Sequence, residues 1–196
     1  MTAITPHISL FDKSFDKVNV ASYKLYIELS KNALKQTILD VRTKTFVALE
    51  VYQFANIYSE HALIPILKEL LKSSKLYHLN FKSIHLAYIN NRSTLIPNGI
   101  FDEQKLAEYH RFNFSVNEED YYLTDKLINL SAANVYSIPN FITTIFSDFS
   151  NLKFTHFSSA LIEAALLDNK INKALSSVYV NVMEESFQVI IIKNQK

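Results

Sequence analysis

Glycine is nearly absent from this sequence. Gly99 is the only one among 196 residues, where average composition would supply about fourteen. Loops that bind phosphate groups use several glycines, because backbone N–H groups must approach the phosphate without a side chain in the way. The sequence accordingly contains no P-loop, no dinucleotide-binding fingerprint and no glycine-flanked nucleophile elbow. Gly99 follows Pro97 and Asn98, so we expect it to take the positive φ of a turn.

Other residue types are also scarce. Cysteine is missing, which excludes disulfides, thiolate catalysis and zinc sites built on sulfur and fits a reducing compartment. Only three of the 20 basic residues are arginine and the net charge is +1, which argues against a dedicated nucleic-acid binder, since lysine lacks the planar fork that suits phosphates and bases. No apolar run approaches the ~18 residues of a membrane span, and the first 16 residues do not resemble a signal peptide. We expect a cytoplasmic protein without membrane insertion.

The residues that are present predict a globular protein with a substantial core. Hydrophobic residues make up 48% of the chain, with 14 Phe and 11 Tyr. A chain of this length buries about 70% of its unfolded surface. In the first twenty residues Phe-Asp-Lys occurs twice, at 11–13 and 15–17. We expect a helical turn or loop that tucks both rings under the fold, with a docking peptide as the alternative.

The first half of the chain predicts a strand meander and a helix. Residues 23–29, 34–40 and 45–52 alternate in hydrophobicity with period two, and short polar turns separate them. A helix capped by Ser59 follows, in which Pro65 delays the first turn. Its core stripe comprises Leu63, Ile66, Leu67, Leu70 and Leu71. Residues 83–89 form a buried strand.

The second half alternates strands with helices. We expect strands at 94–97 and 134–138, a helix at 102–112 capped by Asp102, and another from Pro139 to 149. The acidic run 118–120 predicts a solvated loop. Residues 153–156 are extended, a helix capped by Ser158 or Ser159 runs to 167, and a hairpin pairs 177–182 with 187–192. A meander followed by βα units indicates a mixed α/β sheet, as in ribonuclease-H-like folds.

Several stretches resemble an uncharacterised bacterial family, domain of unknown function 3822. They are Thr-Leu-Ile-Pro-Asn-Gly-Ile-Phe-Asp-Glu at 94–103, Phe-Asn at 112–113, Asn-Val-Tyr-Ser-Ile-Pro at 134–139, Phe-Thr-His at 154–156 and Val-Tyr-Val-Asn-Val at 178–182. The resemblance implies an actin-like ATPase fold, two ribonuclease-H-like lobes around a cleft. More distantly, residues 134–192 are similar to actin-like pilus-assembly proteins. The resemblance divides the chain into an N-terminal extension (1–20), a first lobe (21–175) and the first hairpin of a second lobe (176–196), which we expect to be truncated.

The same resemblance places a nucleotide at two hairpin turns. Active members of the superfamily carry Asp-x-Gly followed by hydroxyl residues there, so that a carboxylate holds the metal and backbone amides face the phosphates. If the cleft is retained here, the residues that would line it are Ser30, Lys31, Asn181, Glu184, Glu185 and Ser186. Neither turn has the glycine, and each of the two glutamates at 4 Å would repel a phosphate by about 4 kcal/mol at an effective dielectric near 20.

Other catalytic constellations are incomplete. A ribonuclease-H-like nuclease needs carboxylates on its first and fourth strands; Glu28 fits the first, but residues 83–89 contain no acid. The six histidines form no His-x-x-x-His or Glu-x-x-His pair. We predict no catalytic residue, no metal site and no cofactor.

The sequence therefore favours a non-catalytic actin-like scaffold or protein-interaction module that has lost nucleotide binding. The alternative is an ATP-binding enzyme or switch with an unorthodox phosphate site, in which Glu184 and Glu185 share a magnesium ion. The partner is a protein that the sequence does not identify. The C-terminal hairpin also has a free edge that favours a homo-oligomer.

Overall fold

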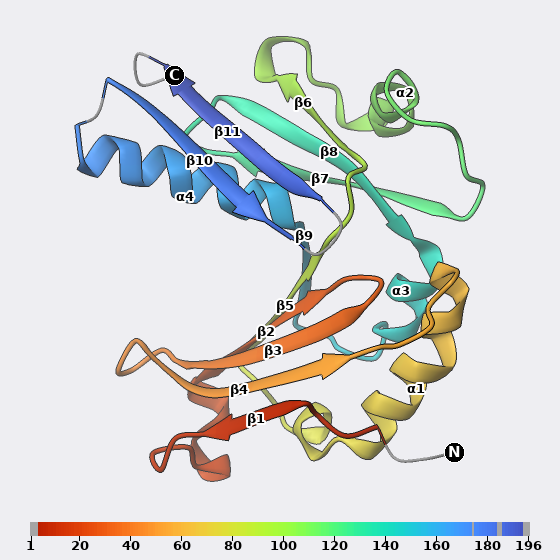
Figure 1. Cartoon of the computed structure of the whole chain (residues 1–196), viewed down its shortest axis with the longest axis vertical. Helices are drawn as coiled ribbons and strands as arrows, with labels where there is room; N and C mark the ends of the chain where they lie inside the picture. Colours follow the sequence, from red (N-terminus) through yellow and green to blue (C-terminus); the bar gives the residue numbers. More distant parts are fainter. Residues whose placement is uncertain (1–3, 174, 184–185, 194–196) are drawn as a thin grey trace. The chain divides into compact units, whose positions relative to one another are not determined.

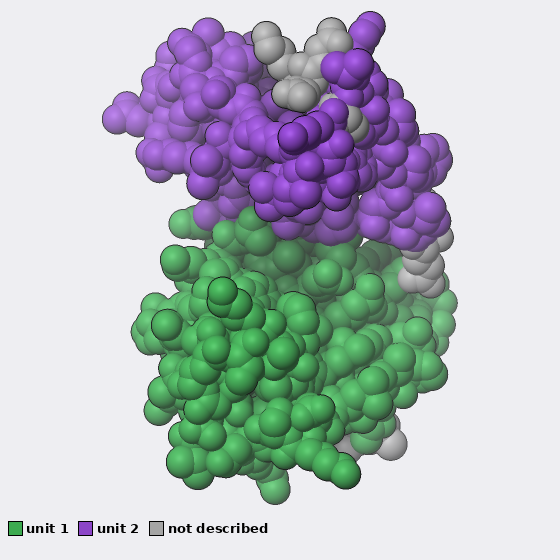
Figure 2. Space-filling view, turned by 90° about the vertical axis from the view of Figure 1, so that its left-hand side faces the viewer, with its two compact units in different colours: residues 1–91, 116–121, 138–155 green, residues 92–115, 122–137, 156–196 purple. Residues whose placement is uncertain are grey.

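The computed structural model describes residues 4–173, 175–183 and 186–193, and the chain divides into two compact units (Figures 1 and 2). Unit 1 comprises residues 1–91, 116–121 and 138–155, and unit 2 comprises residues 92–115, 122–137 and 156–196. The division into 1–20, 21–175 and 176–196 stays a prediction.

Unit 1 is built on a six-stranded mixed sheet in the order β1-β4-β3-β2-β5-β9. Its strands are β1 (Ile8–Phe11), β2 (Tyr23–Leu29), β3 (Ala33–Asp40), β4 (Thr45–Gln53), β5 (Ser83–Tyr88) and β9 (Leu152–His156). β2 pairs antiparallel with β3 and parallel with β5, which makes the sheet mixed. The predicted meander and the strand that follows the helix are thus confirmed.

Helices α1 (Leu63–Ser73) and α3 (Asn140–Ile145) lie against each other in this unit (Figure 1). The predicted stripe of α1 is core, because Leu63, Leu67 and Leu70 are buried. Ser59 precedes a 3₁₀ turn and makes no side-chain cap. α1 begins at Leu63, so Pro65 lies in the first turn, where its missing N–H is not needed.

The sequence did not predict β1. Residues 8–11 pair antiparallel with β4, so Phe11 lies on a strand and not in a helical turn. The predicted loop is present between Phe11 and Phe15, but Phe11 is 44% exposed and is not tucked under the fold. The ring contact is real: the centroids of Phe11 and Phe15 lie 5.2 Å apart, and Phe15 stacks on Tyr23 at 5.7 Å. The two phenylalanines therefore pack through a loop, not through one turn of a helix.

A buried polar network ties the strands of unit 1 together. Glu50, on the buried face of β4, accepts hydrogen bonds from Ser9 Oγ (3.1 Å), Gln36 Nε2 (2.5 Å) and Tyr52 OH (3.2 Å). Gln36 in turn accepts from the Tyr77 hydroxyl at 2.6 Å, which places the segment after α1 on the same face of the sheet. Burial raises the pKa of Tyr52 to about 12 and keeps its hydroxyl protonated as a donor.

Unit 2 contains two small sheets, β6-β8-β7 and β10-β11. Its strands are β6 (Ser93–Pro97), β7 (Asp120–Leu127), β8 (Ala132–Pro139), β10 (Ser176–Val182) and β11 (Phe187–Lys193), and its helices are α2 (Leu106–Arg111) and α4 (Phe157–Ile171). The predicted terminal hairpin is confirmed: β10 and β11 pair antiparallel from Ser176 opposite Lys193 to Val182 opposite Phe187.

Several local predictions were wrong. Gly99 lies in a 3₁₀ turn, Asn98–Ile100, without a positive φ, because Pro97 leads into a helical turn and not into a tight β-turn. The helix from Asp102 divides into a 3₁₀ turn and α2, although the Asp102 carboxylate does cap it by accepting from the Gln104 N–H.

The caps and ends of the later helices also differ from the prediction. His156, not Ser158 or Ser159, caps α4, since its ring nitrogen accepts from the Ser158 N–H. The helix after Pro139 ends at Ile145. In the acidic run, Asp120 begins β7, while Glu119 forms an ion pair with His61 at 2.8 Å.

Asp40 ends β3 with a buried carboxylate that Arg42 holds in two places. Arg42 Nη2 lies 2.7 Å from Asp40 Oδ2, and Nε lies 3.1 Å from Oδ1. These hydrogen bonds lower the pKa of Asp40 from 3.8 to about 2. A carboxylate with a lowered pKa stabilises the fold at pH values above its ordinary pKa, and this contribution is lost as the pH falls toward 2.

We predict that Tyr77→Phe lowers the free energy of unfolding by about 1–3 kcal/mol, because the Gln36 carbonyl loses its buried donor. Urea unfolding followed by circular dichroism measures the change. Tyr58→Phe is the control, since Tyr58 is 87% exposed. Equal stability of both variants would contradict the role given to the network.

Asp40→Asn is expected to flatten the acid dependence of stability. Between about pH 4 and pH 2 the wild-type unfolding free energy should fall more steeply than that of the variant, because only the wild type takes up a proton at this site. Asp148→Asn, which removes an exposed carboxylate, should keep the wild-type slope. Parallel profiles for wild type and Asp40→Asn would disprove the assignment.

Gly99→Ala should leave stability unchanged or raise it by up to about 1 kcal/mol, since a less flexible residue lowers the entropy of the unfolded chain. A Cβ at this position would meet no atom within 4 Å, and φ is not positive. A thermal melt measures the effect. A clear loss of stability would mean that the backbone does require this glycine.

Candidate functional site

The β2–β3 turn carries the first predicted nucleotide residues, Ser30 and Lys31. The Ser30 N–H donates to the Ala33 carbonyl at 2.9 Å. The Ala33 N–H donates to Ser30 Oγ at 3.0 Å, and that hydroxyl lies 3.2 Å from the Ala33 carbonyl. The serine hydroxyl and two backbone amides are therefore engaged inside the turn.

The backbone of this turn does not form an anion-binding nest. Such a nest aims successive N–H groups at one point by alternating right- and left-handed conformations. The described residues with positive φ are Lys44, Asn56, Ser131 and Lys173, and none of them lies in the turn. The turn therefore lacks both the glycine and the left-handed backbone conformation that an anion-binding nest needs.

The second predicted turn joins β10 to β11 in unit 2. The Met183 N–H donates to the Ser186 carbonyl at 2.8 Å and closes the hairpin. Asn181 is half-buried on β10, and Ser186 is exposed. Glu184 and Glu185 lie outside the described residues. Ser30 and Lys31 belong to unit 1, and Asn181 and Ser186 belong to unit 2.

A buried cluster of serine, histidine and aspartate in unit 2 is the most chemically suggestive arrangement. Asp125 Oδ2 accepts from the His156 backbone N–H at 2.8 Å and from Ser159 Oγ at 2.6 Å. His156 Nδ1 lies 2.6 Å from Ser158 Oγ. Asn134 Nδ2 donates to both serine hydroxyls, at 3.1 and 2.8 Å.

This cluster fixes a helix and does not present a nucleophile. His156 is fully buried and Ser158 is 8% exposed, so a substrate could not reach the hydroxyl. The bonds join β7, β8 and the first turn of α4. Tyr136 OH lies 3.5 Å from the Asp125 carboxylate; burial and, second, the charge of Asp125 raise the pKa of Tyr136 far above its ordinary value. The cluster thus sets the position of α4.

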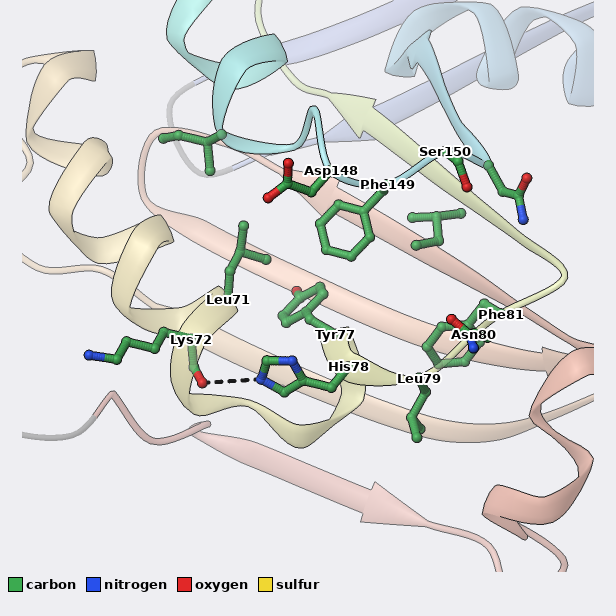
Figure 3. Close-up of a pocket in the computed structure, with 13 residues that line it drawn as sticks. Leu71, Lys72, Tyr77, His78, Leu79, Asn80, Phe81, Asp148, Phe149 and Ser150 are labelled. Atoms are coloured by element: carbon green, nitrogen blue, oxygen red, sulfur yellow. Dashed lines mark hydrogen bonds between the residues drawn. The ribbon is translucent and has the colours of Figure 1, made fainter.

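A pocket of about 390 Å³ lies in unit 1 beside the C-terminal end of α1 (Figure 3). Tyr77 and Phe149 contribute aromatic rings with centroids 6.0 Å apart. Lys72, His78 and Asp148 add charged or titratable groups. The pocket is large enough for a small molecule, but two of its polar groups are already bonded within the protein. His78 Nε2 contacts the Lys72 carbonyl at 3.3 Å, and the Tyr77 hydroxyl donates to Gln36.

Within the described ranges, no group of three or more His, Asp and Glu side chains could hold a metal ion. In the same part of the chain, no helix has the length and apolar character to cross a membrane.

Sequence reasoning missed both the Asp125 cluster and the pocket. The spacing His156-x-Ser158 was a visible signal for the helix cap, but Asp125 and Asn134 are 31 and 22 positions away from His156 and carry no pattern of their own. The pocket is lined by residues from 71–84 and from 145–151. No sequence pattern predicts that these two segments lie next to each other in the fold.

Comparisons with known proteins bear on the fold. A protein from Bacteroides thetaiotaomicron with an actin-like ATPase fold and unknown function superposes with a TM-score of 0.84 at 17% identity, covering 93% of this chain and 70% of that one. This likeness shows the fold: the chain has an actin-like ATPase fold, as predicted.

A second solved structure, a ROK family transcriptional regulator homologous to the E. coli MLC protein, gives a TM-score of 0.44 at 12% identity, covering 91% of this chain and 38% of that one, which is too low to support an argument. Among curated proteins, none matches. The model of the family described as "Protein of unknown function (DUF3822)" matches residues 12–196. Since this match spans nearly the whole chain, the protein belongs to the DUF3822 family.

Proposed function

We propose that this protein is a non-catalytic scaffold or protein-interaction module, a pseudo-ATPase that keeps the actin-like fold and has lost nucleotide binding. The observation that carries the proposal is the β2–β3 turn, whose Ser30 hydroxyl and N–H and Ala33 N–H are bonded to one another. A phosphate that used the Ser30 hydroxyl or either of these two amides would first have to displace the bonds within the turn.

The energetics oppose such an exchange. Each internal hydrogen bond contributes about 0.5–1.5 kcal/mol net, and the turn offers a single cation, Lys31, in return. The nearest ion pair, Lys35 with Glu28 at 3.6 Å, adds a carboxylate to the same end of the sheet. In the second turn, Met183 occupies the place of the glycine and the sequence continues with two glutamates.

Charge supports a protein partner. With a net charge of +1 and three arginines, the chain lacks the excess of basic residues that is typical of nucleic-acid-binding domains. Cytoplasmic location is part of the proposal and rests on the missing cysteines. Self-association through the β10–β11 hairpin also belongs to it, and the free edge, where each strand has a hydrogen-bonded neighbour on only one side, is one of two surfaces of the hairpin that a second copy could use.

Calorimetric titration with ATP and Mg²⁺ tests the loss of nucleotide binding. We expect no saturable heat, which corresponds to a dissociation constant weaker than about 1 mM, and no phosphate release above background. Lys31→Ala is the matched variant and should give the same flat titration. Micromolar binding that disappears in Lys31→Ala would contradict the proposal and establish the ATP-binding alternative.

A further inference from the structure

One face of the β10–β11 hairpin packs against α4, and the other face is exposed. On the packed face, Tyr179, Ile190 and Ile192 meet Ala165 and Leu166. Two hydrogen bonds fasten the same face: Asn169 Nδ2 donates to Ser177 Oγ at 2.8 Å, and the Tyr179 hydroxyl donates to Asp168 Oδ2 at 2.7 Å. Because side chains alternate along a strand, the intervening residues point away from α4.

The intervening residues form what we call the apolar hairpin face. All six are aliphatic or aromatic, and their exposed fractions run from 46% to 79%. They pair across the two strands in register: Val178 with Ile191, Val180 with Val189 and Val182 with Phe187. Ser176 and Lys193, which pair with each other at one end of the hairpin, lie on the same side and add a hydroxyl and an ammonium group at the rim of the face.

A face of this kind is unusual on a monomer. Its six side chains expose on the order of 600 Å² of apolar surface, at the upper end of the range for the largest patch on a typical monomer, and patches of that size often serve a function. A two-stranded sheet is also marginal by itself and gains stability when a second layer covers it. The hairpin has such a layer on the α4 side only.

We propose that a second copy of this chain covers the apolar hairpin face, so that two hairpins pack face to face across a two-fold axis. The proposal rests on the proposed interaction function and names its partner. If they cover each other completely, two such faces bury up to about 1,200 Å² together, which is the lower end of the range for specific protein interfaces. The centre of the face is apolar and its one ammonium group, Lys193, lies at the rim, which favours an apolar protein surface over a nucleic acid or a charged ligand.

The shape of the face fits a copy of itself. β10 contributes a row of three valines, whereas the row on β11 has larger residues at its ends, Phe187 and Ile191. A two-fold axis along the strands lays β10 of each copy over β11 of the other. The smaller row then meets the larger row twice, as an isologous contact requires, and the two sheets stack as in a sandwich.

Face packing explains the exposed side chains, whereas edge pairing does not. A second strand added to the free edge of β10 or β11 would satisfy backbone groups but leave all six side chains in water. Edge pairing is also open-ended, since each added hairpin offers a new edge, while a two-fold face contact closes at two copies.

Light scattering coupled to size-exclusion chromatography, over about 1–100 µM, tests the proposal. The wild type should form a species of twice the 22.6 kDa chain mass. Val180→Lys should shift it to the monomer and weaken dimerisation at least tenfold, because each dimer would bury two lysines. Val18→Lys is the matched control, since Val18 is 88% exposed and lies outside the face, and it should remain dimeric.

Three results would overturn the proposal: a wild-type monomer at every concentration, larger open-ended species, or a dimer that Val180→Lys leaves intact. Circular dichroism checks that the variant is folded. If Val180→Lys does not fold, Val180→Thr replaces it, and an unchanged dimer in that variant counts against the proposal in the same way. Nucleotide titration gives an independent readout, so failure of the dimer and failure of the non-catalytic function are distinguishable.

Discussion

The main sheet is constrained by a buried carboxylate, Glu50, which accepts hydrogen bonds from neutral donors within the described part of the chain. Glu50 is held by three neutral donors from β1, β3 and β4, and Tyr77 extends the network to the segment after α1. A buried charge is costly unless its hydrogen bonds are complete, so the network forms only when these four segments reach their places together. The sheet register, the otherwise exposed strand β1 and the path after α1 are therefore coupled through one side chain.

This constraint separates what the fold needs from what a nucleotide would need. The polar groups of both units that could look functional, Glu50 in one and Asp125 in the other, are engaged in positioning strands and helices. The turn at Ser30 follows the same rule, because its hydroxyl and amides satisfy each other. The hairpin β10–β11 is the exception, with one face satisfied by α4 and the other apolar and exposed. The proposed interaction function therefore relies on apolar contact through this face and not on polar chemistry.

The sequence predicted the elements with strong periodicity and missed those that depend on distant partners. The meander at 23–52 and the core stripe of α1 follow from spacing alone. β1 is too short to show a pattern and exists because β4 pairs with it. The prediction for Gly99 was wrong, because a glycine after Pro-Asn is typical of a turn with positive φ. The residue instead lies in a 3₁₀ turn, a conformation that any residue can adopt. At the candidate site, the composition shows that the turn lacks a glycine. The hydrogen bonds within the Ser30 turn depend on its three-dimensional geometry and could not be predicted from the sequence.

Amide hydrogen exchange at the β2–β3 turn, measured by NMR with and without ATP and Mg²⁺, tests the central claim most directly. The account predicts that the Ser30 and Ala33 amides, both hydrogen-bonded within the turn, exchange slowly and keep their chemical shifts when the nucleotide is added. Fast exchange of these two amides, or shifts that saturate with ATP, would show that the turn is open to phosphate and would contradict the account.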